Sequence, residues 1–308
     1  DHHSHDTAQE LYDDVSDYVE TLRKCSAFMR DLYDPNASYQ AIEPSQAQEV
    51  RRISTSLMRT GSIANFRPLL LAARLKYPND ASLYRRLLTL CEIYAARVYV
   101  IGGLRSNTGQ SSLFRAAREL FEGSPPEAIE SSIADSIRRY ASDESVRAAL
   151  DSRVEWYYRN GHKYVLYEYE LGIVRSAGEV PPFGDLSNGG SKTTEHILPQ
   201  NPSEGSAWWA DFDRDTHRIL VNSIGNLVLT RDNSSYSNKE YAAKRGVPLQ
   251  ESPRCYFSSS ALARERELAQ RFDHWTPETI EKRRQMIVVW ALDRWSLSGS
   301  RRADPAHG

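Results

Sequence analysis

The sequence predicts a mainly α protein: an all-helical N-terminal domain over residues 1–158 and an α+β domain over residues 159–302. Apolar residues recur at three- and four-residue spacing through the first half, as on one face of a helix. No segment with strand-like alternation occurs before about residue 160, whereas two short strand-like runs follow residue 192. A chain of 308 residues also exceeds the usual size of one domain.

The first predicted helix spans Thr7–Tyr33, and Pro35-Asn36 ends it. Its apolar positions form the stripe of a core-facing helix: Leu11, Val15, Tyr18, Leu22, Cys25, Met29 and Leu32. Asp80 or Ser82 is expected to cap the fourth helix, and Pro126 stands where a first-turn proline is tolerated. The further helices are expected at Gln46–Arg59, Phe66–Lys76, Ala81–Ile101, Ser111–Glu122, Pro126–Ala141 and Glu144–Tyr158.

The second domain is expected to follow a loop rich in Pro, Gly, Ser and Asn between Gly178 and Lys192. Two strands are predicted, Thr193–Leu198 and Asn226–Thr230, and then a short helix, Asn233–Lys244. A long closing helix begins at Thr276-Pro277-Glu278 and runs to Trp295. Within it, Glu281-Lys282-Arg283-Arg284 is interpreted as a solvated face.

Composition excludes several classes of protein. The three cysteines, Cys25, Cys91 and Cys255, form no CxxC pair, which argues against a zinc ribbon or a disulfide-built secreted fold and favours the cytoplasm. No apolar run is long enough to span a bilayer, and no signal peptide is visible, so no membrane is expected as a partner. No phosphate-binding loop, dinucleotide fingerprint or nucleophile elbow occurs. The first six residues, DHHSHD, are interpreted either as the remnant of an expression tag or as the point at which a longer chain was cut.

The net charge of −2 is unevenly distributed. Residues 1–50 carry 11 acids and 3 bases, hence −8, whereas residues 231–302 carry 14 bases and 9 acids, hence +5. The basic end is the better candidate for contact with a phosphate backbone. Solvated helices often carry such a surplus, so the two interpretations stay open on this observation.

The chemistry-bearing residues lie between Thr193 and Arg245. Glu195-His196 is followed about thirty residues later by Asn226, and then by Asn233 and Asn238. A strand, a loop, a strand and a short helix with acid, imidazole and amide at these points are the layout of a ββα-metal nuclease site. Histidine titrates near neutral pH and can deprotonate water, and Mg²⁺ takes carboxylate and amide oxygens while keeping several waters.

One geometric objection stands against this layout. Adjacent residues on a regular strand point to opposite faces, so Glu195 and His196 would diverge. Both can reach one site only where the strand ends or twists, and Pro199 three residues later agrees with that.

The sequence resembles the C-terminal HNH region of GmrSD-type, modification-dependent (type IV) restriction endonucleases together with the preceding helical region. The residues that carry the resemblance are Glu195–Gln200 (EHILPQ), Trp208-Trp209, Ile224–Leu229 (IGNLVL), Asn233–Lys239 (NSSYSNK), Tyr241, Lys244, the closing helix with Trp275, Ile280, Arg284 and Trp290, Phe66–Leu71, and Tyr164–Glu170.

The resemblance implies a metal-dependent DNA endonuclease, a nickase in anti-phage defence. It implies His196 as general base, Glu195 as a metal ligand and Asn226 as the residue that orients the His-bearing loop. It also implies Asn233 as the second ligand of Mg²⁺ or Mn²⁺, with Asn238 as the alternative ligand. The phosphate contacts implied are Lys239, Lys244 and Arg245.

The resemblance further implies a partner: an N-terminal sensor domain with a DGQQR-like motif, which this sequence lacks, and which detects a modified cytosine or a backbone phosphorothioate. A homodimer is also possible.

The alternative functions are a catalytically inactive HNH-like module that binds DNA or protein, and an RNA-directed nuclease. His217 and His274 are interpreted as structural or surface residues, and Trp208, Trp209 and Tyr236 as packing residues rather than base-stacking ones.

Overall fold

A computed structural model describes residues 8–34, 36, 39, 42–152, 155–159, 161–174, 180–187, 193–231, 233–246 and 256–298. Within these residues the protein is mainly helical, as predicted. Residues 1–6, Pro35, Cys255 and parts of the loop between Gly178 and Lys192 lie outside the described residues.

The chain divides into two compact units. Of the described residues, the first unit comprises those up to Ala96 and Arg105–Tyr140, and the second comprises Arg97–Leu104 and those from Ala141 onward. The domain boundary predicted between residues 158 and 159 therefore falls inside the second unit.

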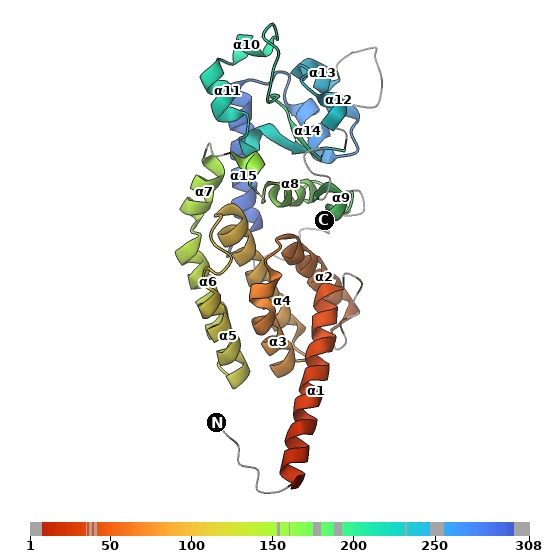
Figure 1. The fold of residues 1–308 in the computed structure, drawn as a ribbon, viewed down its shortest axis with the longest axis vertical. Helices are drawn as coiled ribbons and strands as arrows, with labels where there is room; N and C mark the ends of the chain where they lie inside the picture. The colour runs from red at the N-terminus through yellow and green to blue at the C-terminus, as the bar shows by residue number, and fades with distance from the viewer. Residues whose placement is uncertain are drawn as a thin grey trace. The chain divides into compact units, whose positions relative to one another are not determined.

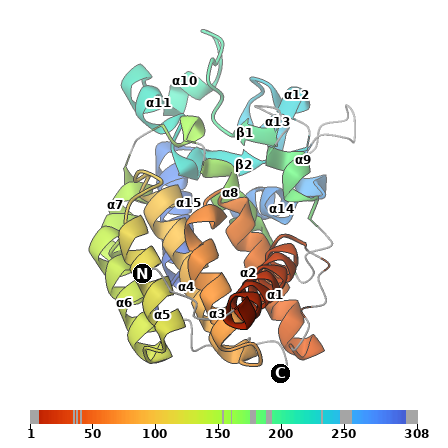
Figure 2. The ribbon, with the colours of Figure 1, turned by 60° about the horizontal axis from the view of Figure 1, so that its bottom comes forward.

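In the first unit, α3 packs against α4 and α5, α2 against α4, and α6 against α4 and α5 (Figures 1 and 2). Asp80 caps α4, since its Oδ1 accepts a hydrogen bond of 2.8 Å from Leu83 N. The described elements are α1 (Ala8–Tyr33), α2 (Pro44–Arg59), η1 (Ile63–Phe66), α3 (Arg67–Lys76), α4 (Ala81–Tyr94), the π-helical η2 (Ala95–Ile101, which runs into the second unit), α5 (Gln110–Glu122) and α6 (Pro126–Tyr140).

Helix α1 departs from the prediction in its N-terminal half. Leu32, near its end, is buried, and α1 contacts α2 and α3. The N-terminal half extends beyond these helices (Figure 1), and four of the seven stripe residues are about half exposed or more: Leu11, Val15, Tyr18 and Leu22. The prediction that the whole stripe faces a core is therefore wrong, because spacing defines a face without supplying a neighbour to cover it.

The second unit is more helical than the sequence predicted. The predicted helix Glu144–Tyr158 ends at Asp151, and the helices α8, α9, α10, α11 and α14 were not predicted. The elements are α7 (Asp143–Asp151), η3 (Trp156–Tyr158), α8 (His162–Leu171), α9 (Phe183–Ser187), β1 (Thr194–His196), α10 (Trp208–Asp211), α11 (Arg214–Leu220), η6 (Ile224–Asn226), β2 (Leu227–Leu229), α12 (Asn233–Tyr236), α13 (Tyr241–Arg245), η7 (Phe257–Ser259), α14 (Ala263–Arg271) and α15 (Pro277–Arg294).

The two described strands are antiparallel and lie side by side (Figure 2), with Glu195 opposite Val228 and His196 opposite Leu227. The predicted helix Asn233–Lys244 is split into α12 and α13. Ser237 has φ +45° between them, a left-handed backbone that no continuous α-helix contains. This break turns the chain after α12, so that α13 starts anew at Tyr241.

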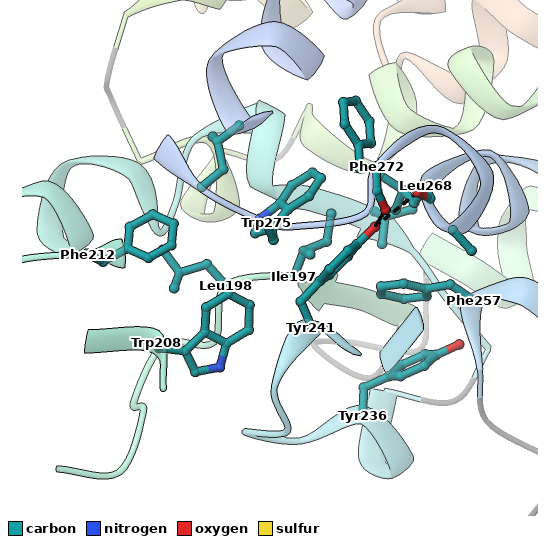
Figure 3. Packing of buried hydrophobic residues seen from close by; sticks show 13 residues of the cluster. Ile197, Leu198, Trp208, Phe212, Tyr236, Tyr241, Phe257, Leu268, Phe272 and Trp275 are labelled. Carbon is teal, nitrogen blue, oxygen red and sulfur yellow. Dashed lines mark hydrogen bonds between the residues drawn. The ribbon is translucent and has the colours of Figure 1, made fainter. Parts of the chain in front are cut away.

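A core rich in aromatic residues joins the hairpin region and α13 to α14 and the start of α15 (Figure 3). The Tyr241 hydroxyl donates to the carbonyls of Leu268 and Phe272 at 3.0 and 3.1 Å, which fixes the start of α13 against the end of α14. The Tyr241 ring stacks on Trp275. Trp208 and Tyr236 belong to the same cluster, which confirms them as packing residues.

Helix α15 fixes the segment that leads into β2. A Cβ on Gly225 would lie 2.4 Å from the Ile280 carbonyl oxygen, so only glycine allows this approach. The buried guanidinium of Arg283 donates to the carbonyls of Gly225 and Leu227, both at 2.7 Å. The interpretation of residues 281–284 as a solvated face is therefore wrong for Arg283 and Arg284, which are both buried.

Among the helices in the described ranges, none combines the length and the apolar character that crossing a membrane requires.

Candidate active site

A polar pocket of about 260 Å³ opens at the C-terminal end of β1. Segments far apart in the sequence line it: the end of β1 and the chain after it, η3, and α12 with the turn that follows it. Four of the predicted site residues are among those that line it, and the full set is Tyr157, Glu195, His196, Pro199, Gln200, Asn201, Asn233, Ser237 and Asn238.

Glu195 and His196 both line this pocket although they are neighbours on β1. The strand ends at His196, and a backbone bond from Ile197 N to Asn226 O, 3.0 Å long, follows it. The two side chains contact different segments, Glu195 the Lys244 ammonium on α13 and His196 the Asn222 amide, and both residues still line one pocket.

Asn226 holds the chain that follows His196. Its Oδ1 accepts a hydrogen bond from Leu198 N at 2.8 Å, and its Nδ2 donates one to Leu198 O at 2.9 Å. The side-chain amide thus binds both backbone groups of Leu198, as a residue on a neighbouring strand does. Nδ2 also donates to Val221 O at 2.8 Å, and Trp275 Nε1 donates to Oδ1 at 3.0 Å. Asn226 is fully buried, so these four hydrogen bonds satisfy its amide inside the fold and hold the chain after β1 in place.

Lys244 lies on the buried side of the same loop. Its Nζ donates to Glu195 Oε1 at 2.5 Å and to the carbonyls of His196 and Ile197 at 2.8 and 3.0 Å. The side chain has no exposed surface. The prediction that Lys244 contacts DNA phosphates is corrected: its three donors are used inside the fold, where they neutralise a carboxylate and satisfy two carbonyls.

The imidazole of His196 is bound on its edge and on its face. Nε2 lies 3.0 Å from Asn222 Oδ1, and the ring centroid lies 4.4 Å from that of Tyr157. Burial lowers the pKa of His196 to about 4, against the hydrogen bond to Asn222, which favours the charged form. The imidazole is therefore neutral at pH 7 and holds a lone pair that can accept a proton.

Glu195 has an unusual carboxyl group. Burial raises its pKa to about 7, while the charge and hydrogen bond of Lys244 act in the opposite direction. Oε1 belongs to the ion pair, and Oε2 takes part in no hydrogen bond with the described part of the chain. The carboxylate can thus offer one oxygen to a ligand in the pocket.

Asn233 and Asn238 bring amide groups to the same pocket from the start of α12 and the turn after it. Asn238 is exposed and Asn233 half-buried. One carboxylate oxygen with amide oxygens suits a hard divalent cation that keeps water ligands, so the residues present fit Mg²⁺ or Mn²⁺. Within the described ranges no three His, Cys, Asp or Glu side chains gather as a metal-binding group.

The other predicted phosphate contacts lie outside the pocket lining. Lys239 is exposed directly after Asn238. Arg245 is engaged elsewhere: its Nε donates to Ala269 O at 2.8 Å, and its guanidinium pairs with Asp273 at 2.7 Å. His217 bonds Pro199 O through Nε2 at 2.9 Å, in keeping with the structural role predicted for it.

Sequence reasoning missed Asn222 and Tyr157. Asn222 stands four residues before Asn226 in a stretch without a motif, and Tyr157 lies in a segment predicted to be helical. No periodicity or spacing distinguishes either residue. Only the folded chain brings them to the imidazole.

Comparison with protein-family models gives one match, to "GmrSD restriction endonucleases, C-terminal domain", over residues 135–290. This range includes every residue that lines the pocket. Comparisons with curated proteins and with solved structures give no match. The match spans half of the chain and agrees with the EHILPQ and GNL motifs around which the pocket is built, so the chain belongs to the GmrSD restriction endonucleases, whose C-terminal domain it carries.

Proposed function

We propose that this protein is a DNA endonuclease that hydrolyses one phosphodiester bond at a time, with His196 as general base and one divalent cation in the pocket. The observation that supports this proposal most directly is that Glu195, His196, Asn233 and Asn238 all line one pocket. The hairpin β1–β2 followed by α12 and α13 would then correspond to a ββα-metal core, with the helix in two parts.

The side chains have distinct roles in this proposal. Neutral His196 accepts a proton from a water molecule as the water oxygen bonds to phosphorus, and the bond from phosphorus to the 3′ oxygen breaks, leaving a 5′ phosphate. Asn226 and Lys244 hold the backbone of residues 196–198, which keeps the imidazole in place.

Glu195 and Asn233, or Asn238 in place of Asn233, would hold Mg²⁺ or Mn²⁺. A divalent cation bound there supplies positive charge for the phosphate and the departing oxygen. One site per chain cuts one strand, so nicking is expected unless two chains pair. The biological role in keeping with the family is restriction of foreign DNA in the cytoplasm, with a sensor domain as partner.

The test is nicking of supercoiled plasmid by the purified protein with Mg²⁺ or Mn²⁺. The expected result is conversion to open circles that EDTA and His196→Ala abolish. His274→Ala is the matched control, because His274 is an exposed histidine outside the pocket, and it should nick as the unaltered protein does.

Metal-dependent nicking that persists in His196→Ala would refute the proposal. Absence of nicking above the His196→Ala background, with DNA binding retained, would favour the inactive binding module. Preferential cleavage of single-stranded RNA in competition with plasmid would favour the RNA-directed nuclease.

A further inference from the structure

Asn222 makes two contacts that converge on the proposed general base. It lies between α11 and η6, and its Oδ1 is 3.0 Å from His196 Nε2. An amide oxygen can only accept, so in this bond Nε2 carries the hydrogen. Nδ1 is then the nitrogen with the lone pair, and it makes no hydrogen bond to any described residue.

The backbone of Asn222 also fixes the ring that covers the imidazole. Its carbonyl oxygen accepts from Trp156 N at 2.9 Å, at the start of η3. The next residue, Tyr157, packs its ring on His196 with centroids 4.4 Å apart and planes inclined by 56°. Asn222 therefore contacts the edge of the His196 imidazole directly and also holds the segment whose Tyr157 ring packs on its face.

Asn222 is itself held in the fold. Its neighbour Val221 is buried, and the Val221 carbonyl accepts from Asn226 Nδ2 at 2.8 Å. The two asparagines therefore divide the support of His196: Asn226 binds the backbone of the loop, and Asn222 binds the imidazole.

We infer that Asn222 is a positioning residue that fixes His196 as the tautomer with hydrogen on Nε2 and the lone pair on Nδ1, the nitrogen that accepts the proton from water. This inference rests on the proposed function. In the proton transfer, a water O–H bond breaks, the proton forms a bond to Nδ1, and the oxygen electron pair bonds to phosphorus. The Nε2–H bond to Asn222 stays intact, and the amide oxygen stabilises the imidazolium that results.

The first test is spectroscopic and needs no activity. The full chain is labelled with ¹⁵N-histidine, and the His196 signals are assigned by their loss in His196→Ala. The expected spectrum has hydrogen on Nε2 and a bare Nδ1, and Asn222→Leu replaces it by a mixture of tautomers. Asn222→Asp, which keeps an acceptor, retains the Nε2–H form. Thr216→Val is the matched control, because it removes a side-chain hydrogen bond to Asp213 on the neighbouring helix α11 and leaves the His196 signals unchanged.

The second test is kinetic. Asn222→Leu is expected to lower kcat for nicking about 10- to 100-fold with little change in KM, and Asn222→Asp to restore most of it. Asn222→Ala serves in place of Asn222→Leu should the leucine variant not fold.

Hydrogen on Nδ1 in the unaltered protein, or an unchanged His196 spectrum in a folded Asn222→Leu or Asn222→Ala variant, would overturn the inference. A change confined to KM in Asn222→Leu, with kcat unchanged, would also overturn the inference. A protein with the expected tautomer but without nicking would contradict the proposed function and leave the positioning role of Asn222 intact, so the two failures are distinguishable.

Discussion

Lys244 Nζ lies 2.5 Å from Glu195 Oε1, with both side chains buried. The lysine comes from α13 and the glutamate from β1, 49 residues apart in the chain. The ammonium also bonds two carbonyls of the loop after β1. This ion pair joins helix α13 to the loop that carries His196, so its loss should change both stability and activity.

Lys244→Met should destabilise the protein by roughly 3 kcal/mol at pH 8 in EDTA, since it leaves a buried carboxylate unpaired. The loss should be smaller at pH 6, because the pKa of Glu195, already raised by burial, lets the unpaired carboxyl take a proton. Urea unfolding measures both values. Arg218→Met, which removes an exposed pair with Asp215, is the control and should leave stability unchanged. An equal, negligible loss in both variants would contradict the structural role of Lys244.

Asn226→Asp should unfold at a lower temperature and lose nicking. The change replaces the Nδ2 donor by an oxygen that faces the carbonyls of Leu198 and Val221, and it costs on the order of 3 kcal/mol. Thermal unfolding and plasmid nicking measure the two effects. The same substitution at the exposed Asn201 should leave the unfolding temperature unchanged. Similar unfolding temperatures for the two variants would mean that the Asn226 amide is not needed to hold the loop.

Lys239→Met should weaken binding to duplex DNA and lower the slope of log affinity against log salt by about 0.9, the value for one lost phosphate contact. Lys239 is exposed beside the pocket, whereas Lys244 is buried, so Lys244→Met should leave the slope unchanged. Lys282→Met, an exposed lysine on α15, is the control for loss of charge alone. If the salt slope of the affinity fell in Lys244→Met and stayed constant in Lys239→Met, Lys244 rather than Lys239 would be the phosphate contact.

Glu265 should make stability depend on pH. Burial raises the pKa of this carboxyl on α14 to about 8, so the folded state binds the proton more tightly than the unfolded state. The stabilisation is fully present below pH 4.5, the unfolded pKa, and is lost as the pH rises through about 8. Glu265→Gln should therefore flatten the decline in unfolding free energy between these values, as followed by urea unfolding. A steeper decline in the glutamine variant would contradict a raised pKa.

Val15→Ala and Val50→Ala form a matched pair on the first two helices. Val50 on α2 is fully buried, and its truncation should cost about 1 to 2 kcal/mol. Val15 on α1 is 52% exposed, so the same change should have little effect on unfolding. Equal losses measured by urea unfolding would mean that the N-terminal half of α1 is covered in solution.

The sequence by itself determined the helical class, the two residues able to cap the fourth helix, the two strands and the residue types of the candidate site. These features follow from local rules. Spacing predicts one face of a helix, and a carboxylate accepts hydrogen bonds from the N–H groups of a first turn. A Glu-His pair with asparagines has the oxygen ligands and the imidazole that metal-assisted hydrolysis uses. The motif EHILPQ and the residues GNL also identified the two segments that pair.

Only the tertiary structure decided which of these side chains face the pocket and which support it. Lys244 and Lys239 carry the same charge in the sequence, and burial against β1 alone makes one an internal partner of Glu195. The break at Ser237 that divides the predicted helix depends on a backbone turn that no spacing encodes. Desolvation and contacts between distant segments are properties of packing, which is why the roles of Lys244 and Asn222 and the exposed stripe of α1 could not be predicted from the order of residues.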